Sequence, residues 1–262
     1  MSNVDFDVVI IGLGPSGGTL ANLLAMNNLS ILIIEKEATI YNLPRAVHFD
    51  DEVMRVFNTI GITKSLTKKL IINKGTKFVD EKGNLLLDWP RPKVITENGW
   101  YPSYRFHQPD LERSLRHKLK KFEKVIISQN SEVYKTISHK NYSIIQYKNL
   151  KTKQIFSVKS KYVIGCDGAN SFLRKQIKSE MEHLGFEQRW AVIDLILKTK
   201  KTNLPDRTIQ YCNSKRPATY CRNVGKRRRW EIALKEEESV EQFFDCKTLW
   251  KFLSQWVSQD EA

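Results

Sequence analysis

A glycine-rich turn between two apolar segments dominates the first 35 residues of this 262-residue chain. The run Val8–Ile11 is predicted to form a buried parallel strand, and it leads into Gly12-x-Gly14-x-x-Gly17. A helix-forming stretch follows, and then a second apolar run that ends at Glu35. Strand, glycine turn, helix, strand and acid occur in the order of a dinucleotide-binding βαβ unit, so the sequence predicts such a unit here.

Each position of the motif has a physical role. Gly12 permits a tight turn, Gly14 lets backbone approach a pyrophosphate, and Gly17 lets a helix, expected over 19–27, pack on the strand. The N-terminus of that helix offers amide groups and a positive dipole end to phosphates. Glu35 follows Gly12 by 23 residues, where an acid accepts hydrogen bonds from ribose hydroxyls. The alternative is a βαβ unit that has a glycine turn but binds no phosphate. If the unit binds a dinucleotide, the candidate cofactor-binding residues are Gly12, Gly14, Pro15, Ser16, Gly17, Glu35 and Lys36.

Three further segments carry residues that an NAD-dependent dehydrogenase does not need. Asp167 and Gly168 form a turn dipeptide after an apolar run, which places the acid at the C-terminal edge of a strand, where ligands gather in open α/β sheets. Arg45 follows the second strand and a proline, a suitable position for a clamp on pyrophosphate. Gln108 precedes a helix expected over 110–121. Each of these features alone has an ordinary explanation, as a surface turn, a solvated arginine or a loop amide. The prediction of a cofactor site therefore depends on their occurring together in this order.

In that order the motifs resemble those of the group A aromatic hydroxylases, which are single-component, FAD-dependent enzymes. The segments Pro44–Glu52 and Arg227–Glu231 favour the branch that acts on 3-(3-hydroxyphenyl)propionate. The resemblance implies FAD as cofactor, NADH or NADPH as reductant, and O₂ and a small phenolic aromatic acid as substrates, in aromatic compound catabolism. It also implies five cofactor contacts beyond the glycine motif, which are Arg45, Gln108, Val133, Asp167 and Gly168.

The resemblance implies an α/β fold, α+β overall, with a Rossmann-like FAD-binding domain and an inserted antiparallel β substrate domain. We expect the FAD-binding domain over 1–75 and 100–178, and an incomplete substrate-side domain over 76–99 and 179–262. Within these domains the sequence predicts a hairpin over 76–88, a β-meander made of short runs over 124–127, 131–134, 142–146 and 154–158, substrate-side strands over 190–197, 208–212, 218–221 and 229–234, and a helix over 236–258.

His48 is the local candidate for a base that removes the phenol proton, which would activate the ring. It lies near Arg45 in the loop expected to approach the flavin, and imidazole titrates in the useful pH range. The alternative is a loop histidine that caps the following helix, for which Asp50 or Asp51 is also a candidate cap and Gly61 the expected stop. The oxidative chemistry itself belongs to the cofactor.

One family motif is missing. Group A hydroxylases carry a second flavin motif, Gly-Asp-Ala-x-His, on a later strand, whereas this sequence contains no Gly-Asp dipeptide and ends at Ala262. We therefore expect a C-terminally truncated hydroxylase, a chain completed by a second polypeptide, or a catalytically inactive FAD- or ADP-binding chain. An NAD-dependent oxidoreductase is a weaker alternative, and a homo-oligomer stays open.

The chain is strongly basic, with a net charge of +14 from 43 Lys and Arg against 29 Asp and Glu. Nucleic acid or an anionic membrane is one interpretation of that charge. The basic residues are scattered and lack a nucleic-acid-binding motif, so we expect solvated faces and no nucleic-acid partner. A basic surface can also raise the local concentration of NAD(P)H and carboxylate substrates.

The four cysteines show no metal-ligand spacing, so no metal site is predicted. They are Cys166, Cys212, Cys221 and Cys246. No run of eighteen apolar residues predicts a membrane span, and the first apolar run follows acids rather than a basic signal region. These features predict a cytoplasmic protein with reduced thiols.

Overall fold

The computed structural model describes residues 4–199 and 202–262, which fall into two compact units. The first unit comprises Met1–Pro44, Val56–Leu66 and Gln108–His183. The second comprises Arg45–Arg55, Thr67–His107 and Leu184–Ala262. Both units are discontinuous in sequence, so the chain passes between them several times.

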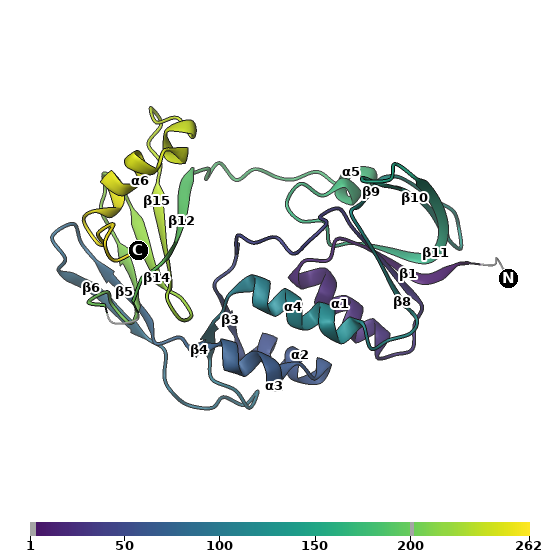
Figure 1. Ribbon diagram of the computed structural model, residues 1–262, viewed down its shortest axis with the longest axis horizontal. Helices are drawn as coiled ribbons and strands as arrows, with labels where there is room; N and C mark the ends of the chain where they lie inside the picture. The colour runs from purple at the N-terminus through teal and green to yellow at the C-terminus, as the bar shows by residue number, and fades with distance from the viewer. Residues whose placement is uncertain (1–3, 200–201) are drawn as a thin grey trace. The chain divides into compact units, whose positions relative to one another are not determined.

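The first unit is built on a six-stranded sheet of order β8-β2-β1-β11-β10-β9 (Figure 1). Its strands are β1 (Phe6–Ile11), β2 (Ile31–Glu35), β8 (Val125–Gln129), β9 (Ser131–Ser138), β10 (Ser143–Asn149) and β11 (Ile155–Gly165). Strands β8, β2, β1 and β11 run parallel, whereas β10 pairs antiparallel with both β11 and β9. The mixed α/β fold predicted from the sequence is confirmed.

Two strand predictions in this sheet are wrong in detail. The run over 154–158 and the apolar run before Asp167 form one strand, β11. Its first part pairs with β10 and its last part pairs with β1, and Ser160 is shared by both ladders. The run over 124–127 does not join the meander. It forms β8, which lies parallel to β2 because the helix before it crosses over the sheet and returns the chain in the same direction.

Strands β1 and β2, at the centre of the parallel part of the sheet, are buried on both faces. Val8 and Ile10 of β1 belong to a core cluster with residues of α1 (Pro15–Ala25) and with Leu119 at the end of α4 (Gln108–Leu119). Their neighbours Val9 and Ile11 point to the opposite face and pack with residues of β9 and β10. Alternation along β1 thus places the helices on one face and the meander on the other.

Local signals set the helix ends near the glycine motif and beyond it. Helix α1 begins at Pro15, earlier than the predicted 19–27, because proline is preorganised for the first turn of a helix. Helix α2 (Asp51–Ile60) begins where the Val53 amide donates to Asp50 Oδ1 at 3.0 Å, and Gly61 follows it with φ +80°. The predicted cap and stop of α2 are confirmed. The remaining short helices before residue 180 are α3 (Thr63–Leu66), η1 (Thr67–Lys69) and α5 (Phe172–Gln176).

The second unit contains a six-stranded sheet of order β12-β15-β14-β13-β5-β6. Its strands are β5 (Gly75–Val79), β6 (Leu85–Pro90), β12 (Trp190–Ile196), β13 (Thr208–Tyr211), β14 (Ala218–Arg222) and β15 (Arg227–Ala233). The predicted hairpin is confirmed as the antiparallel pair β5–β6, and β5 lies parallel to β13. A smaller sheet of order β3-β7-β4 is made of β3 (His48–Asp50), β4 (Ile71–Ile72) and β7 (Ser103–Arg105).

One face of the large sheet is covered by the C-terminal helix (Figure 1). Trp230 is fully buried there and packs in one cluster with Leu253 and Val257. The helix predicted over 236–258 is interrupted, and this region forms η2 (Glu241–Phe244) and α6 (Cys246–Leu253). The break lies at Asp245, whose backbone is extended. Its side chain caps α6 by accepting from the Thr248 amide at 2.9 Å. Within residues 4–199 and 202–262, no helix has the length and apolar character needed to span a bilayer.

Glu238→Gln is expected to destabilise the protein by about 1 kcal/mol at neutral pH. Arg216 donates to both Glu238 oxygens, at 2.9 and 2.5 Å, and this hydrogen-bonded pair lowers the pKa of Glu238 to about 2. Because the folded pKa is depressed, the stabilisation is fully present above about pH 4.5 and is lost as the pH falls toward 2.

Urea denaturation at pH 7 and pH 3 measures this effect. The difference between the wild type and Glu238→Gln should shrink at pH 3, while the exposed control Glu123→Gln should differ little from the wild type at either pH. A difference that stays constant with pH would contradict the assignment.

Candidate functional site

The glycine turn after β1 is held by close backbone packing. Gly12 has φ +99°, and its amide donates to Ile34 O at 2.8 Å. A Cβ at Gly12 would lie 2.3 Å from Cys166 O, and one at Gly17 would lie 2.0 Å from Gly12 O. Real Cβ atoms do not approach that closely, so the fold itself requires glycine at both positions.

Gly14 differs from its two neighbours in the motif. Its backbone is extended, with φ −73° and ψ −169°, and a Cβ built there would meet no atom within 4 Å. It precedes the N-terminus of α1, where the first-turn amides have no intrahelical acceptor and no acidic side chain is present. The open side of Gly14 therefore faces a position suited to an anion.

Glu35, at the end of β2, is fixed next to this turn. Its side chain is largely buried, Oε2 accepts from the Leu13 amide at 2.6 Å, and Oε1 accepts from the Glu37 amide at 2.8 Å. Each carboxylate oxygen can accept further hydrogen bonds, so Glu35 retains capacity for ligand hydroxyls. Lys36 follows it and is exposed, as is Ser16 at the start of α1.

A row of polar side chains on α4 lies against the same turn. Gln108 Nε2 donates to Glu112 Oε1 at 2.9 Å, and Arg116 Nη2 donates to Glu112 Oε2 at 3.4 Å and to Leu13 O at 3.1 Å. Burial, reinforced by the charge of Glu35, raises the pKa of Glu112 although Gln108 and Arg116 oppose the shift. Within the part of the chain that the structure describes, Arg116 Nε and Nη1 are buried without a hydrogen-bond partner.

Two members of that row, Glu112 and Arg116, were not among the candidate residues. The signal that could have found them is their spacing, because Gln108, Glu112 and Arg116 follow one another at intervals of four and so share one face of a helix. Burial of such a polar row indicates a role beyond solvation.

Asp167 and Gly168 lie beside Gly12 at the end of β11, as expected for a strand-end turn. Gly168 has φ +79°, and a Cβ on Gly12 would lie 3.0 Å from the Asp167 amide nitrogen. The Asp167 carboxylate accepts from Ser171 Oγ at 2.6 Å and from the Leu173 amide at 3.1 Å. Asp167 thus also stabilises the start of α5, a structural role that the sequence did not indicate.

The candidate residues of the first unit are brought together with one exception. The glycine turn, Glu35, the α4 row and the Asp167 turn surround Leu13 and Gly12. Val133 lies apart, because its side chain is buried in the core cluster with Val9 on the other face of the sheet. Only its backbone is left for a ligand.

Two candidates, Arg45 and His48, belong to the second unit. The Arg45 backbone is anchored by Arg229 of β15, whose Nη1 donates to Arg45 O at 3.1 Å. Arg229 is 1% exposed and forms a two-pronged pair with Asp194 of β12, with Nε–Oδ1 at 2.9 Å and Nη2–Oδ2 at 2.8 Å. This buried pair fixes the backbone that presents the exposed Arg45 side chain.

His48 lies on β3, directly opposite Arg105 of β7. Burial lowers the pKa of His48, and the charges of Arg105 and Arg91 lower it further. The ring is therefore neutral at pH 7 and able to accept a proton. His48 is not the cap of the following helix, because Asp50 occupies that position.

Arg91→Gln is expected to raise the pKa of His48 toward its ordinary value near 6.5, since it removes one of the two cations that oppose protonation. NMR titration of the histidine ring protons measures the shift, with His48→Gln identifying the signal. The exposed Lys140→Gln change, in the other unit, serves as the control. An unchanged titration in Arg91→Gln would show that this charge does not act on His48.

The chain matches the family model described as "FAD binding domain" over residues 5–251. It therefore belongs to the FAD-binding-domain family, and FAD is the cofactor that this family binds. The resemblance to FAD-dependent aromatic hydroxylases drawn from the motifs is confirmed at this level.

Among curated proteins, the chain is 28% identical over 261 residues to a probable NADH-specific resorcinol 4-hydroxylase of Rhodococcus jostii (strain RHA1), covering 98% of this chain and 48% of the relative. It is 29% identical over 191 residues to a 3-(3-hydroxy-phenyl)propionate/3-hydroxycinnamic acid hydroxylase of Mycolicibacterium gilvum (strain PYR-GCK), covering 73% of this chain and 32% of the relative. The chain thus spans about half the length of these relatives or less.

The fold is similar to that of solved flavin-dependent monooxygenases. The crystal structure of p-nitrophenol 4-monooxygenase from Pseudomonas putida DLL-E4 superposes with a TM-score of 0.83 at 16% identity, covering all of this chain and 65% of that one. At this identity the likeness establishes the fold alone.

The residues of the first unit fit the ADP half of FAD on three observations of the structure. The side of Gly14 is open, the start of α1 carries no acid, and two buried nitrogen atoms of Arg116 lack a partner within residues 4–199 and 202–262. Positive charge and free amide groups beside an open backbone suit a pyrophosphate, and the fixed carboxylate of Glu35 suits a ribose.

Proposed function

We propose that this chain is the FAD-binding part of an NAD(P)H-dependent monooxygenase that hydroxylates a phenolic aromatic acid such as 3-(3-hydroxyphenyl)propionate. The observation that carries the proposal is the open Gly14 cradle beside the fixed carboxylate of Glu35, in a chain of the FAD-binding-domain family.

In this proposal the first unit holds the ADP half of the cofactor. Gly14 and the start of α1, with Pro15 and Ser16, receive the pyrophosphate, and Glu35 accepts from the ribose, with Lys36 beside it. Gln108, the Val133 backbone and the Asp167–Gly168 turn complete the contacts. Arg116 acts through Leu13, whose carbonyl it holds, and so positions the turn.

The second unit forms the substrate side. Bound FAD supplies the redox chemistry that activates O₂. Arg45 contributes positive charge on a backbone fixed by Arg229, and His48 accepts the phenol proton as a neutral imidazole. Proton removal would make the ring more electron-rich at the position that is hydroxylated.

The identity of the reductant and substrate is supported by the names of relatives. The Rhodococcus jostii relative is named as NADH-specific, which favours NADH over NADPH. The two curated relatives are named for different phenols. Resorcinol is neutral, whereas 3-(3-hydroxyphenyl)propionate carries a carboxylate. We favour the acid because of the Pro44–Glu52 and Arg227–Glu231 segments.

The test is oxidation of NADH or NADPH by the FAD-loaded protein in the presence of O₂, with and without 3-(3-hydroxyphenyl)propionate. The proposal predicts bound flavin and phenol-stimulated oxidation of NAD(P)H. Tight FAD binding without phenol-stimulated oxidation would contradict it and would favour the alternative, a catalytically inactive FAD-binding chain.

A further inference from the structure

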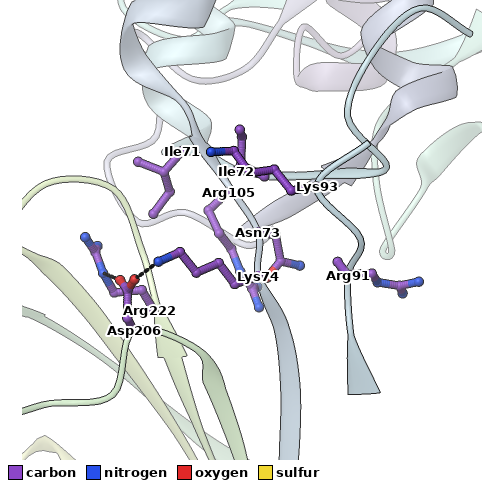
Figure 2. Close-up of a pocket in the computed structure, with 9 residues that line it drawn as sticks. All are labelled: Ile71, Ile72, Asn73, Lys74, Arg91, Lys93, Arg105, Asp206 and Arg222. Carbon is purple, nitrogen blue, oxygen red and sulfur yellow. Dashed lines mark hydrogen bonds and ion pairs between the residues drawn. The ribbon is translucent and has the colours of Figure 1, made fainter. Parts of the chain in front are cut away.

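The second unit contains a basic pocket that the flavin assignment does not use. Its volume is about 290 Å³, and it lies where β4, β7 and β14 meet the segments after β6 and before β13. The pocket is lined by Ile71, Ile72, Asn73, Lys74, Arg91, Lys93, Arg105, Asp206 and Arg222 (Figure 2). Five of these side chains are cationic and one is acidic, so the pocket carries a large excess of positive charge.

The single acid is already neutralised. Asp206 accepts from Lys74 Nζ at 2.5 Å and pairs with Arg222 Nε at 3.2 Å, and Figure 2 shows it between these two cations. Hydrogen bonding to Lys74, and then the charge of Lys74 and the contact with Arg222, lower the pKa of Asp206. It is therefore ionised at neutral pH and offers little charge to the rest of the pocket.

The other three cations have no carboxylate partner within residues 4–199 and 202–262. Arg91 and Lys93 are exposed at the pocket mouth, with the Arg91 guanidinium 4.6 Å from the centre of the Trp89 ring. Arg105 is 6% exposed, and its Nη2 donates to the hydroxyl of Thr208. Burial lowers the pKa of Arg105 although the charge of Glu231 opposes the shift, and a buried guanidinium that forms no salt bridge is costly.

We propose that this pocket binds the anionic group of a small ligand, either the carboxylate of an aromatic acid or a phosphate of the nicotinamide nucleotide. Arg105 would supply the two-pronged contact at the inner wall, and Arg91 and Lys93 would supply charge at the mouth. Ile71 lies beside Arg105 in the β4–β7 register and gives the pocket an apolar wall.

The proposal deepens the proposed function and rests on it for the choice of ligands. His48 is opposite Arg105 in the β3–β7 ladder, as Ile71 is in the β4–β7 ladder, so the three side chains form a row on one face of the small sheet. A carboxylate held by Arg105 would therefore place the rest of an aromatic acid near the candidate base. The pocket also explains how a chain of this family could prefer an acid over neutral resorcinol.

The experiment measures ligand binding by calorimetry to the full 262-residue chain, with and without FAD. The double variant Arg91→Gln/Lys93→Gln removes two exposed charges of the pocket and leaves the buried Arg105 in place. Its matched control is Lys135→Gln/Lys140→Gln, which removes two exposed charges from the other unit and has the same net charge. The ligands are 3-(3-hydroxyphenyl)propionate, neutral resorcinol and inorganic phosphate.

The pocket variant should bind the acid about fivefold more weakly, since two exposed charge contacts together contribute about 1 kcal/mol. Its affinity for resorcinol should stay within about twofold of the wild type, and the control pair should change neither. Selective loss of phosphate binding instead of acid binding would support the anion site and assign it to the nucleotide.

Three outcomes would overturn the proposal: no anion binding by the wild type, equal loss in the pocket and control variants, or equal loss of acid and resorcinol. The titrations with and without FAD distinguish failure of the pocket proposal from failure of the proposed function. Selective acid binding in a chain that fails to bind FAD would leave the pocket standing and remove the flavin assignment.

Discussion

Gly17→Ala is expected to lower the free energy of unfolding by about 3 kcal/mol or more. The added Cβ would lie 2.0 Å from Gly12 O, an atom of the backbone that cannot rotate away. Relief requires α1 to move off β1, and this helix packs on the central strands of the first unit. One added methyl group therefore disturbs the packing of the core of that unit, which lowers the free energy of unfolding.

Urea denaturation followed by far-UV circular dichroism measures this loss, and hydrogen exchange of the β1 amides locates it. Gly14→Ala is the matched control, because it adds the same methyl group three residues earlier, where no atom lies within 4 Å of the added Cβ. The control should cost less than about 1 kcal/mol. Equal destabilisation by the two changes would show that the packing of the turn is not the cause.

The parts of the fold that the sequence predicted are those with local causes. The apolar run of β1, the glycine turn and the acid at the end of β2 are read within 35 residues, and the structure forms them in that order. The hairpin β5–β6 and the cap and stop of α2 are equally local. Each depends on backbone preferences of a few neighbouring residues.

The features that the sequence did not predict depend on partners far along the chain. Strand β11 is continuous because it pairs with β10 in its first part and with β1 in its last part. The interruption at Asp245 is an exception, because its capping side chain accepts from the amide of Thr248, three residues further on, inside an otherwise helical pattern. The burial of Arg105 follows from strands that come together only in the folded unit. Periodicity carries no information about such pairings.

The same distinction applies to the candidate site. Gly12, Gly14, Gly17 and Glu35 were found because their spacing reflects one local turn. The contact of Arg116 with Leu13 O spans 103 residues, so only the folded chain reveals it.

Gly14→Val is expected to weaken binding of ADP and FAD by about 100-fold or more while leaving the fold intact. The valine side chain would occupy the open space beside the start of α1, where the pyrophosphate is proposed to lie. Loss of two charge-assisted hydrogen bonds to phosphate corresponds to at least about 3 kcal/mol, which is about 100-fold in affinity. The extended backbone of Gly14 accepts a β-branched residue without strain, so stability should change by less than about 1 kcal/mol.

The most direct test of FAD binding at this turn is calorimetric titration of the wild type, Gly14→Ala and Gly14→Val with FAD and with ADP. We expect one site in the wild type, a smaller loss of affinity in Gly14→Ala, a loss of about 100-fold or more in Gly14→Val, and melting temperatures that stay close together. Unchanged FAD and ADP affinity in a folded Gly14→Val variant would contradict the account and place the cofactor elsewhere.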